Sequence, residues 1–181
     1  EQVATNVLLW DLNDKQRLQV ELSLAQTWYV AGSARKVMRE MPRLTKLAEE
    51  SGQRFTRMLC TSLWALSSLE LGRWDDAVTL AESALKQAEV LGNRREIANQ
   101  LNNLGLIYAR TGEFQRADDV LNRAMTSDFS SRDSLSLAYS MRNLGQQRFL
   151  AGNHKAAASL LEEATFLSKS SGDRINSARG Q

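Results

Sequence analysis

The sequence predicts an all-α protein in which antiparallel helix pairs stack into one repeating array. Apolar residues recur every three or four positions, as they do on amphipathic helices, for example at Val78, Ala81 and Leu85. The 181-residue chain contains a single proline, and no segment alternates as a half-buried strand does. A third observation is the spacing of 40 residues between four glycines, Gly32, Gly72, Gly112 and Gly152.

Other residues repeat in register with these glycines. A small residue precedes each glycine by seven positions: Ala25, Ala65, Gly105 and Gly145. A ring follows the last three glycines at plus two, and an alanine follows them at plus five: Trp74, Phe114 and His154, then Ala77, Ala117 and Ala157. A second series of glycines comprises Gly52, Gly92 and Gly172 and is interrupted by Arg132. These series together establish a repeat of 40 residues.

Each unit has room for two helices of roughly 15 residues and two short turns. The glycine between the two helices can adopt a positive φ and end the first helix. The small residues, one on each helix, allow the two helices to approach closely, and Leu121 or Leu161 would fill the space between neighbouring pairs. Because one pair cannot bury its apolar face alone, stacking of pairs must supply the core.

The third copy carries the pattern most fully, at Leu101, Leu104, Gly105, Tyr108, Gly112, Phe114, Ala117, Leu121 and Ala124. This set resembles a complete tetratricopeptide repeat (TPR). The long period is similar to that of kinesin light chains, G-protein-regulator polarity adaptors and the TPR tails of large bacterial regulators. The resemblance implies a right-handed α-solenoid whose first helices line a concave groove. The first copy matches least, and we expect Pro42 to kink or restart its second helix.

The period predicts a single array over residues 1–181, with repeats at about 17–53, 54–93, 94–133 and 134–172. Partial repeats are expected at 1–16 and 173–181. The chain starts without a methionine and stops in mid-pattern, so we expect a segment of a longer protein. Exposed terminal helices of such a segment could pair between molecules.

Composition argues against several classes of function. Apolar residues make up 43% and charged residues 24% of the chain, as in ordinary globular proteins. The net charge of +2 is too balanced to favour nucleic acid as a partner. No apolar run approaches the roughly 18 residues of a membrane span, and one cysteine excludes an internal disulfide. We expect a cytoplasmic protein with neither nucleic-acid nor membrane partners.

The sequence offers little for a catalytic or metal site. One histidine excludes a two-histidine metal site, and Cys60 and His154 fall two repeats apart, where we interpret them as a core thiol and a substitute for Phe. Acidic pairs such as Asp75–Asp76 and Asp118–Asp119 are expected on solvated outer faces. No nucleotide-binding, serine-hydrolase or zinc-protease motif occurs. We therefore predict no enzyme activity, no metal and no cofactor.

The resemblance implies a peptide-binding site on the concave face of the last two repeats. Asn103 and Asn143 share one repeat position, which matches the asparagine ladder of kinesin light chains and polarity adaptors. An amide offers a peptide backbone both a donor and an acceptor. The alternative is that these asparagines cap or bridge adjacent helices. The expected peptide-contacting set is Asn99, Asn102, Asn103, Leu106, Arg110, Tyr139, Arg142, Asn143, Gln146 and Phe149.

The first two repeats lack the ladder, since Ser23 and Leu63 occupy its position. Their groove is predicted to be apolar and to suit an amphipathic helix or a neighbouring segment of the array, through Leu59, Leu63, Leu66 and Leu69. Trp28 is expected to pack where the repeat pattern has a tyrosine, and Tyr29 is a second candidate for contact with a ligand.

The leading hypothesis is a non-catalytic interaction module that holds a peptide or helical segment of another protein in its concave groove. The alternative is a sensor or oligomerisation region of a multidomain bacterial transcriptional or signalling regulator. The segment GRWDDAVTLAESAL favours this second hypothesis, because it is similar to TPR tails that follow nucleotide-binding and DNA-binding domains. An adaptor would bind a linear segment, whereas a sensor would change its oligomeric state with an effector.

Overall fold

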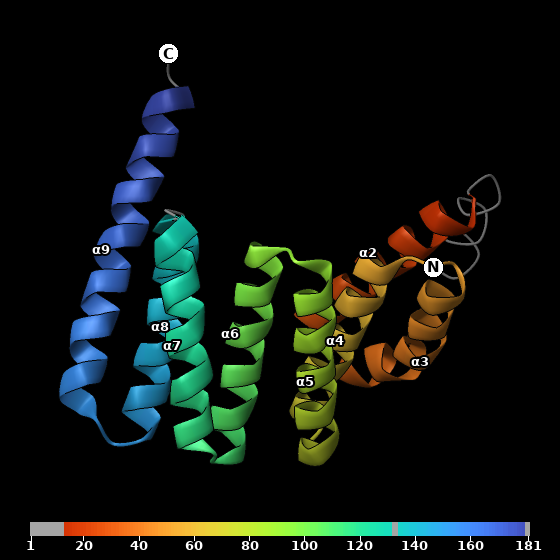
Figure 1. Ribbon diagram of the computed structural model, residues 1–181, viewed down its shortest axis with the longest axis horizontal. Helices are drawn as coiled ribbons and strands as arrows, with labels where there is room; N and C mark the ends of the chain where they lie inside the picture. The colour runs from red at the N-terminus through yellow and green to blue at the C-terminus, as the bar shows by residue number, and fades with distance from the viewer. Residues whose placement is uncertain (1–12, 132–133, 180–181) are drawn as a thin grey trace. The chain divides into compact units, whose positions relative to one another are not determined.

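The computed structural model describes residues 13–131 and 134–179, and for 129–131 and 172–179 it describes the backbone alone. Every element in these ranges is an α-helix, which confirms the predicted all-α class (Figure 1). The described chain divides into two compact units, with the boundary between Leu91 and Gly92. None of the described helices combines the length and apolar character that a bilayer crossing requires.

The first unit contains four helices: α2 (Asp14–Val30), α3 (Ala34–Glu50), α4 (Arg54–Glu70) and α5 (Trp74–Leu91). Helix α3 packs against both α2 and α4, and α4 packs against α5. The core of this unit draws on α2, α3 and α4 and contains Leu18, Leu22, Ala25, Val37, Met41, Leu44, Ala48, Cys60 and Leu63. Trp28 packs against this core, as predicted, with the Lys36 ammonium 3.8 Å from its ring centroid.

Two expectations for the first unit need correction. Leu63, expected to line an open groove, is only 7% exposed and belongs to the core, because its face of α4 is covered by the preceding helix pair. Pro42 does not restart α3, which is continuous from Ala34 to Glu50. The proline side chain is exposed, so its ring lies on the solvent side of the helix.

The second unit contains α6 (Arg94–Thr111), α7 (Phe114–Ser131), α8 (Ser134–Leu150) and α9 (His154–Arg179). Helix α6 packs against α7 and α8, and α8 also packs against α7 and α9 (Figure 1). Asn93 caps α6, since its side-chain oxygen accepts hydrogen bonds from the backbone N–H groups of Arg95 and Glu96 at 3.1 and 3.3 Å. The sequence predicts a turn near Gly172, whereas α9 runs on to Arg179.

Gly112 shows why the 40-residue glycine series exists. It ends α6 with a φ of 85°, in the left-handed region that side chains with a Cβ rarely adopt. This conformation lets the Glu113 N–H donate to the Tyr108 carbonyl at 2.8 Å, which satisfies a carbonyl at the helix end. The other three glycines of the series also have positive φ, which confirms their predicted role in ending helices.

A glycine and a leucine determine how closely each helix pair of the second unit packs. A Cβ added at Gly105 on α6 would lie 2.4 Å from Cγ of Leu121 on α7, far inside van der Waals contact. At Gly145 on α8, an added Cβ would lie 2.9 Å from Cγ of Leu161 on α9. The close approach predicted from the small residues is therefore confirmed, and it is tighter in the first of these pairs.

We predict that Gly105→Ala destabilises the fold by about 1–3 kcal/mol, because the added Cβ would lie 2.4 Å from Cγ of Leu121, a buried side chain that would have to shift. The free energy of unfolding of Gly145→Ala should stay within about 1 kcal/mol of that of the wild type. Leu161 is only half-buried and can move, and alanine has the better helix propensity. Urea unfolding followed by circular dichroism measures both variants. Equal losses would show that Leu121 relaxes as freely as Leu161.

Cys60 provides a probe for the first unit. Its side chain is fully buried in the core, and burial raises the pKa of its thiol to about 12. Because the thiolate is the reactive form, we predict that iodoacetamide labels Cys60 at pH 8 on the order of a hundredfold more slowly in the folded chain than in urea. Similar labelling rates in both conditions would contradict the packing of α4 against α2 and α3.

Candidate functional site

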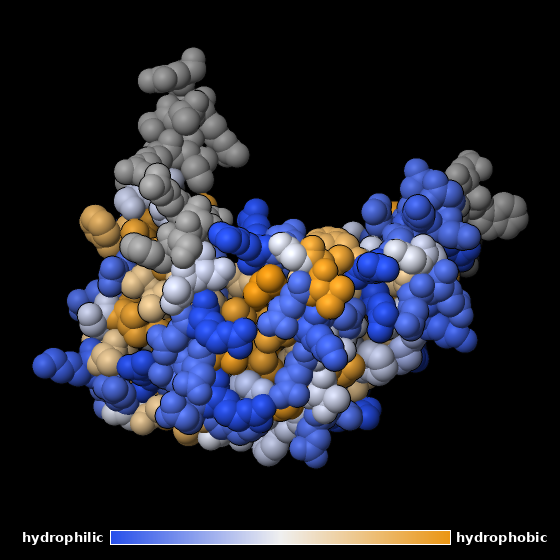
Figure 2. Space-filling model, viewed as in Figure 1, coloured by the Kyte–Doolittle hydropathy of each residue, from blue (hydrophilic) through white to orange (hydrophobic). Residues whose placement is uncertain are grey.

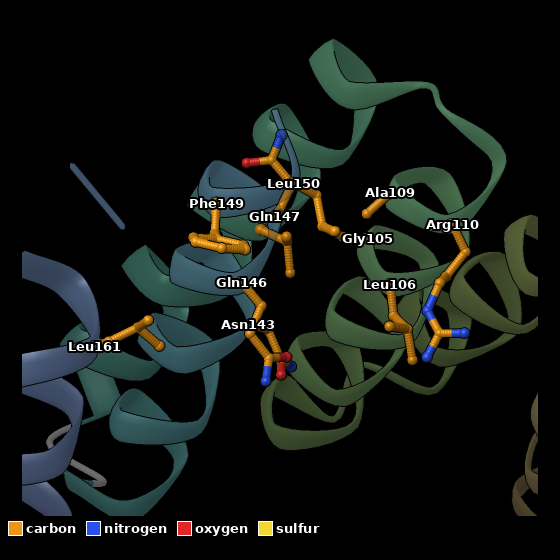
Figure 3. A pocket seen from close by; sticks show the side chains of 11 residues that line it. Gly105, Leu106, Ala109, Arg110, Asn143, Gln146, Gln147, Phe149, Leu150 and Leu161 are labelled. Carbon is orange, nitrogen blue, oxygen red and sulfur yellow. The ribbon is translucent and has the colours of Figure 1, made fainter. Parts of the chain in front are cut away.

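A pocket of about 510 Å³ lies between α6 and α8 of the second unit (Figure 3). Helix α6 contributes Gly105, Leu106, Ala109 and Arg110, and α8 contributes Asn143, Gln146, Gln147, Phe149 and Leu150. Leu121 from α7 and Leu161 from α9 complete the lining. These two leucines are the same side chains that pack against the helix glycines, so the contact that sets the spacing within each pair also supplies part of the pocket wall.

Most of the lining is apolar, and one aromatic ring stands beside it. The Phe149 side chain is 57% exposed, which is high for a ring of this size. Its centroid lies 5.0 Å from that of the His154 imidazole, in a tilted arrangement. His154, interpreted from the sequence as a substitute for Phe, is itself exposed, so its ring contact with Phe149 lies at the surface.

The polar groups of the pocket differ in how firmly they are held. Arg110 and Gln146 are exposed, and neither makes a hydrogen bond or ion pair with the described residues. Asn143 is half-buried, and its Nδ2 donates to Oδ1 of Asn102 at 3.1 Å. Figure 3 shows the side chains of Asn143 and Gln146 close together at one edge of the pocket, with Leu106 and Arg110 on the facing helix.

Gln147 is a pocket residue that the sequence analysis missed. It is only 3% exposed, and its Nε2 donates to the Phe114 carbonyl at 2.9 Å. Its Oε1 is buried and has no hydrogen-bond partner in the described part of the chain. The repeat could have indicated this burial, because position 147 lies one period of 40 residues after Ile107, which is fully buried. A glutamine at a core position needs a polar partner.

The structure brings five of the ten predicted site residues together around this pocket: Leu106, Arg110, Asn143, Gln146 and Phe149. Four others, Asn99, Asn103, Tyr139 and Arg142, do not line it. Among these, Asn99 donates to Glu96 at 3.4 Å, and the Arg142 guanidinium lies 4.8 Å from the centroid of the Tyr139 ring.

Asn102 departs from its expected place in the open groove. It is 2% exposed and donates to the Ala98 carbonyl at 3.0 Å and to the Ser140 hydroxyl at 2.7 Å. One residue along a helix is a rotation of about 100°, which is enough to move a side chain from the groove to the interior. The bond from Asn143 to Asn102 agrees with the alternative in which an asparagine bridges neighbouring helices.

Asp118 also departs from the sequence expectation. Predicted on a solvated outer face, it is half-buried and forms an ion pair with Arg148 across α7 and α8. Arg148 approaches both carboxylate oxygens, with Nη2 2.9 Å from Oδ2. This contact through two nitrogens links α7 and α8, the same two helices that the bond from Gln147 to Phe114 joins. No group of three or more His, Cys, Asp or Glu side chains within the described ranges is arranged to hold a metal ion.

Comparison with known proteins identifies the repeat. The family model of the tetratricopeptide repeat matches residues 57–128. The apo form of RapI has a similar structure, with a TM-score of 0.79 and 17% sequence identity over 98% of this chain. Aspartyl phosphate phosphatase F from Bacillus subtilis gives a TM-score of 0.80 with 18% identity over 92% of this chain. A putative kinesin light chain with TPR-like repeats, from Podospora anserina, gives 0.69 with 17% identity over 94%.

These similarities concern the fold, and they confirm the predicted α-solenoid of stacked antiparallel helix pairs. The chain spans 65% of the RapI chain, 44% of the phosphatase chain and 84% of the kinesin light chain structure. No curated protein sequence matches it.

For the pocket itself, we predict that Gln147→Met keeps the free energy of unfolding within about 1 kcal/mol of wild type. It loses the bond to Phe114 but also removes an unpaired buried oxygen. Gln147→Glu should lower the free energy of unfolding by about 2–4 kcal/mol, since it would bury a carboxylate whose oxygen faces the Phe114 carbonyl in place of a donor. Urea unfolding compares the two, and a better tolerated glutamate would contradict the buried placement of this side chain.

Proposed function

We propose that this chain, whose residues 57–128 match the tetratricopeptide repeat family, is a non-catalytic interaction module that binds an extended segment of another protein in the α6–α8 pocket. One observation carries this proposal, namely an apolar pocket bordered by side-chain amides and flanked by an exposed phenylalanine. A volume of about 510 Å³ is in the range of natural ligand sites and has room for large apolar side chains.

The chemistry of the lining suits a peptide. An extended segment brings backbone N–H and C=O groups that must stay hydrogen-bonded when water is displaced. Asn143 and Gln146 can pair with both kinds of group. Arg110, which has no acidic partner among the described residues, adds a cation at the rim for a carboxylate of the bound segment. Phe149 gives the segment an aromatic surface to cover.

The same lining supports the absence of catalysis. Its polar groups are three carboxamides and one guanidinium, from Asn143, Gln146, Gln147 and Arg110. None of these groups exchanges a proton readily near neutral pH or acts as a nucleophile. The proposal includes a cytoplasmic location, where Cys60 stays a free thiol.

One feature favours the alternative of a sensor or oligomerisation region. Phe166 on α9 is 70% exposed, away from the pocket. Apolar side chains also reach the surface elsewhere among hydrophilic ones, on the face shown in Figure 2. A second copy of the chain would cover such a residue in an oligomer. This alternative predicts a concentration-dependent oligomer that Phe166→Ala weakens.

Peptides selected from a random library against the immobilised 181-residue chain test the proposal. We expect Phe149→Ala to reduce the binding free energy of the selected peptides by about 1–2 kcal/mol, because an exposed ring beside a pocket is a typical binding hot spot. Fluorescence anisotropy titration measures the affinity. The Phe149 ring is exposed, so its removal should not unfold the chain.

Phe166→Ala is the matched control, since it removes the same kind of exposed ring outside the pocket. Unchanged peptide affinity in this variant, together with a loss in Phe149→Ala, supports the pocket as the binding site. Equal losses in both variants, or a loss in Phe166→Ala alone, would move the binding surface to α9 and contradict the proposal.

A further inference from the structure

A chain of hydrogen bonds runs beneath the pocket through three helices. Asp128 on α7, Ser140 on α8 and Asn102 on α6 are 4%, 0% and 2% exposed. The Ser140 hydroxyl lies 2.5 Å from Oδ2 of Asp128 and 2.7 Å from Nδ2 of Asn102. Oδ1 of Asn102 lies 3.1 Å from Nδ2 of Asn143, which reaches the pocket. We call Asp128, Ser140 and Asn102 the buried relay.

The direction of every bond in the relay follows from two groups that only accept. The Ala98 carbonyl can only accept a hydrogen bond, so the Asn102 atom 3.0 Å from it must be the amide nitrogen. This nitrogen has a second hydrogen, which it donates to Ser140. The Ser140 hydroxyl hydrogen is then available for Asp128, whose carboxylate accepts it.

The orientation of Asn102 in turn determines that of Asn143. With its nitrogen committed to Ala98 and Ser140, Asn102 presents its oxygen to Asn143. Two oxygens cannot hydrogen-bond to each other, so Asn143 must present its nitrogen to the interior. Its own Oδ1 diverges from that nitrogen and accepts no hydrogen bond from the described residues. The Asn143 amide is thereby held in one orientation, with its oxygen free to accept a hydrogen bond from a ligand and one N–H hydrogen not used by Asn102.

Gln147 presents a second acceptor in the wall of the same pocket. Its nitrogen is committed to the Phe114 carbonyl, and its oxygen has no partner in the described part of the chain. A buried amide oxygen without a partner costs free energy, which a donor from a ligand would recover. The side-chain nitrogens of Asn143 and Gln147, both on α8, are therefore each held by a hydrogen bond. The oxygen of each side chain remains available to accept a hydrogen bond from a ligand.

We infer that the buried relay fixes the orientation of Asn143, so that its oxygen and that of Gln147 make the α6–α8 pocket select ligands that place an N–H donor beside an apolar side chain. The ligand class is a peptide backbone with a leucine-sized side chain in the pocket. Asn143 is then a specificity-determining residue, and Ser140 and Asn102 are positioning residues that act through it. This inference rests on the proposed function and deepens it.

Two small probes separate donor recognition from apolar burial. N-acetyl-leucine methylamide carries two N–H donors, and the matched ester replaces each N–H with an oxygen at nearly the same size. We expect the ¹⁵N-labelled 181-residue chain to bind the methylamide about threefold to tenfold more tightly than the ester. Titration at millimolar concentrations, followed by the backbone signals of Gly105, Leu106 and Phe149, gives both affinities.

Asn102→Ala tests the relay at a distance from the ligand, because it removes the oxygen that holds Asn143, and because Asn102 does not line the pocket. We expect the preference for the methylamide to fall below about twofold in this variant. Ser127→Ala is the control, since Ser127 precedes Asp128 in the chain but is not part of the relay, and it should keep the wild-type preference. A full preference in Asn102→Ala would overturn the relay.

The remaining outcomes distinguish this inference from the proposed function. Equal binding of both probes by the wild type would overturn donor selection while leaving the pocket as a peptide site. Binding of neither probe would overturn both proposals. If Asn102→Ala fails to fold, hydrogen exchange of the side-chain amide protons in the wild type tests the relay instead. Those of Asn143 should exchange with water more slowly than those of the exposed Gln146, and equal exchange would overturn the relay.

Discussion

The close contact between Gly105 and Leu121 is the constraint on which the second unit depends. Because Gly105 lacks a Cβ, α6 and α7 approach until Leu121 occupies the space where that atom would be. Gly145 and Leu161 repeat the arrangement for α8 and α9. The two leucines then reach the pocket between α6 and α8, so its apolar wall follows from the packing of each pair. Wider spacing of the pairs would change the pocket as well as the core.

The same packing makes a polar interior possible. Helices α6, α7 and α8 are close enough for Asn102, Ser140 and Asp128 to hydrogen-bond in sequence. Buried polar groups are costly unless they are paired, and here each of the three has a partner at 2.5 to 3.1 Å. Pairing also gives the network a direction, which an apolar core would lack. The order of donors and acceptors in the interior therefore determines which way the Asn143 amide faces at the pocket.

Most of what the sequence predicts about the fold follows from its 40-residue repeat. The 40-residue glycine series correctly indicated where helices end, and the small residues indicated where helix pairs touch, because both follow from local backbone and steric requirements. Five of the ten residues predicted to contact a peptide, Leu106, Arg110, Asn143, Gln146 and Phe149, lie around one pocket. These residues share helix faces, which a repeat register can identify.

The remaining residues depend on contacts between distant parts of the chain. Asn102 and Asn103 differ by one helical step, and only the packing of α8 shows that Asn102 is the buried one. Leu63 enters the core because α2 and α3 cover its face of α4. Asp118 is drawn to Arg148, 30 residues along the chain. Such partners belong to tertiary structure, and spacing along a sequence does not specify them.

The most direct measurement of the central claim is a map of backbone amide shifts in the ¹⁵N-labelled 181-residue chain when it binds a library-selected peptide. The account predicts that the largest shifts fall on α6 and α8, around Gly105, Leu106, Asn143 and Phe149, and that the first unit changes little. Shifts confined to the first unit, or to α9 around Phe166, would contradict the assignment of the binding site to the α6–α8 pocket.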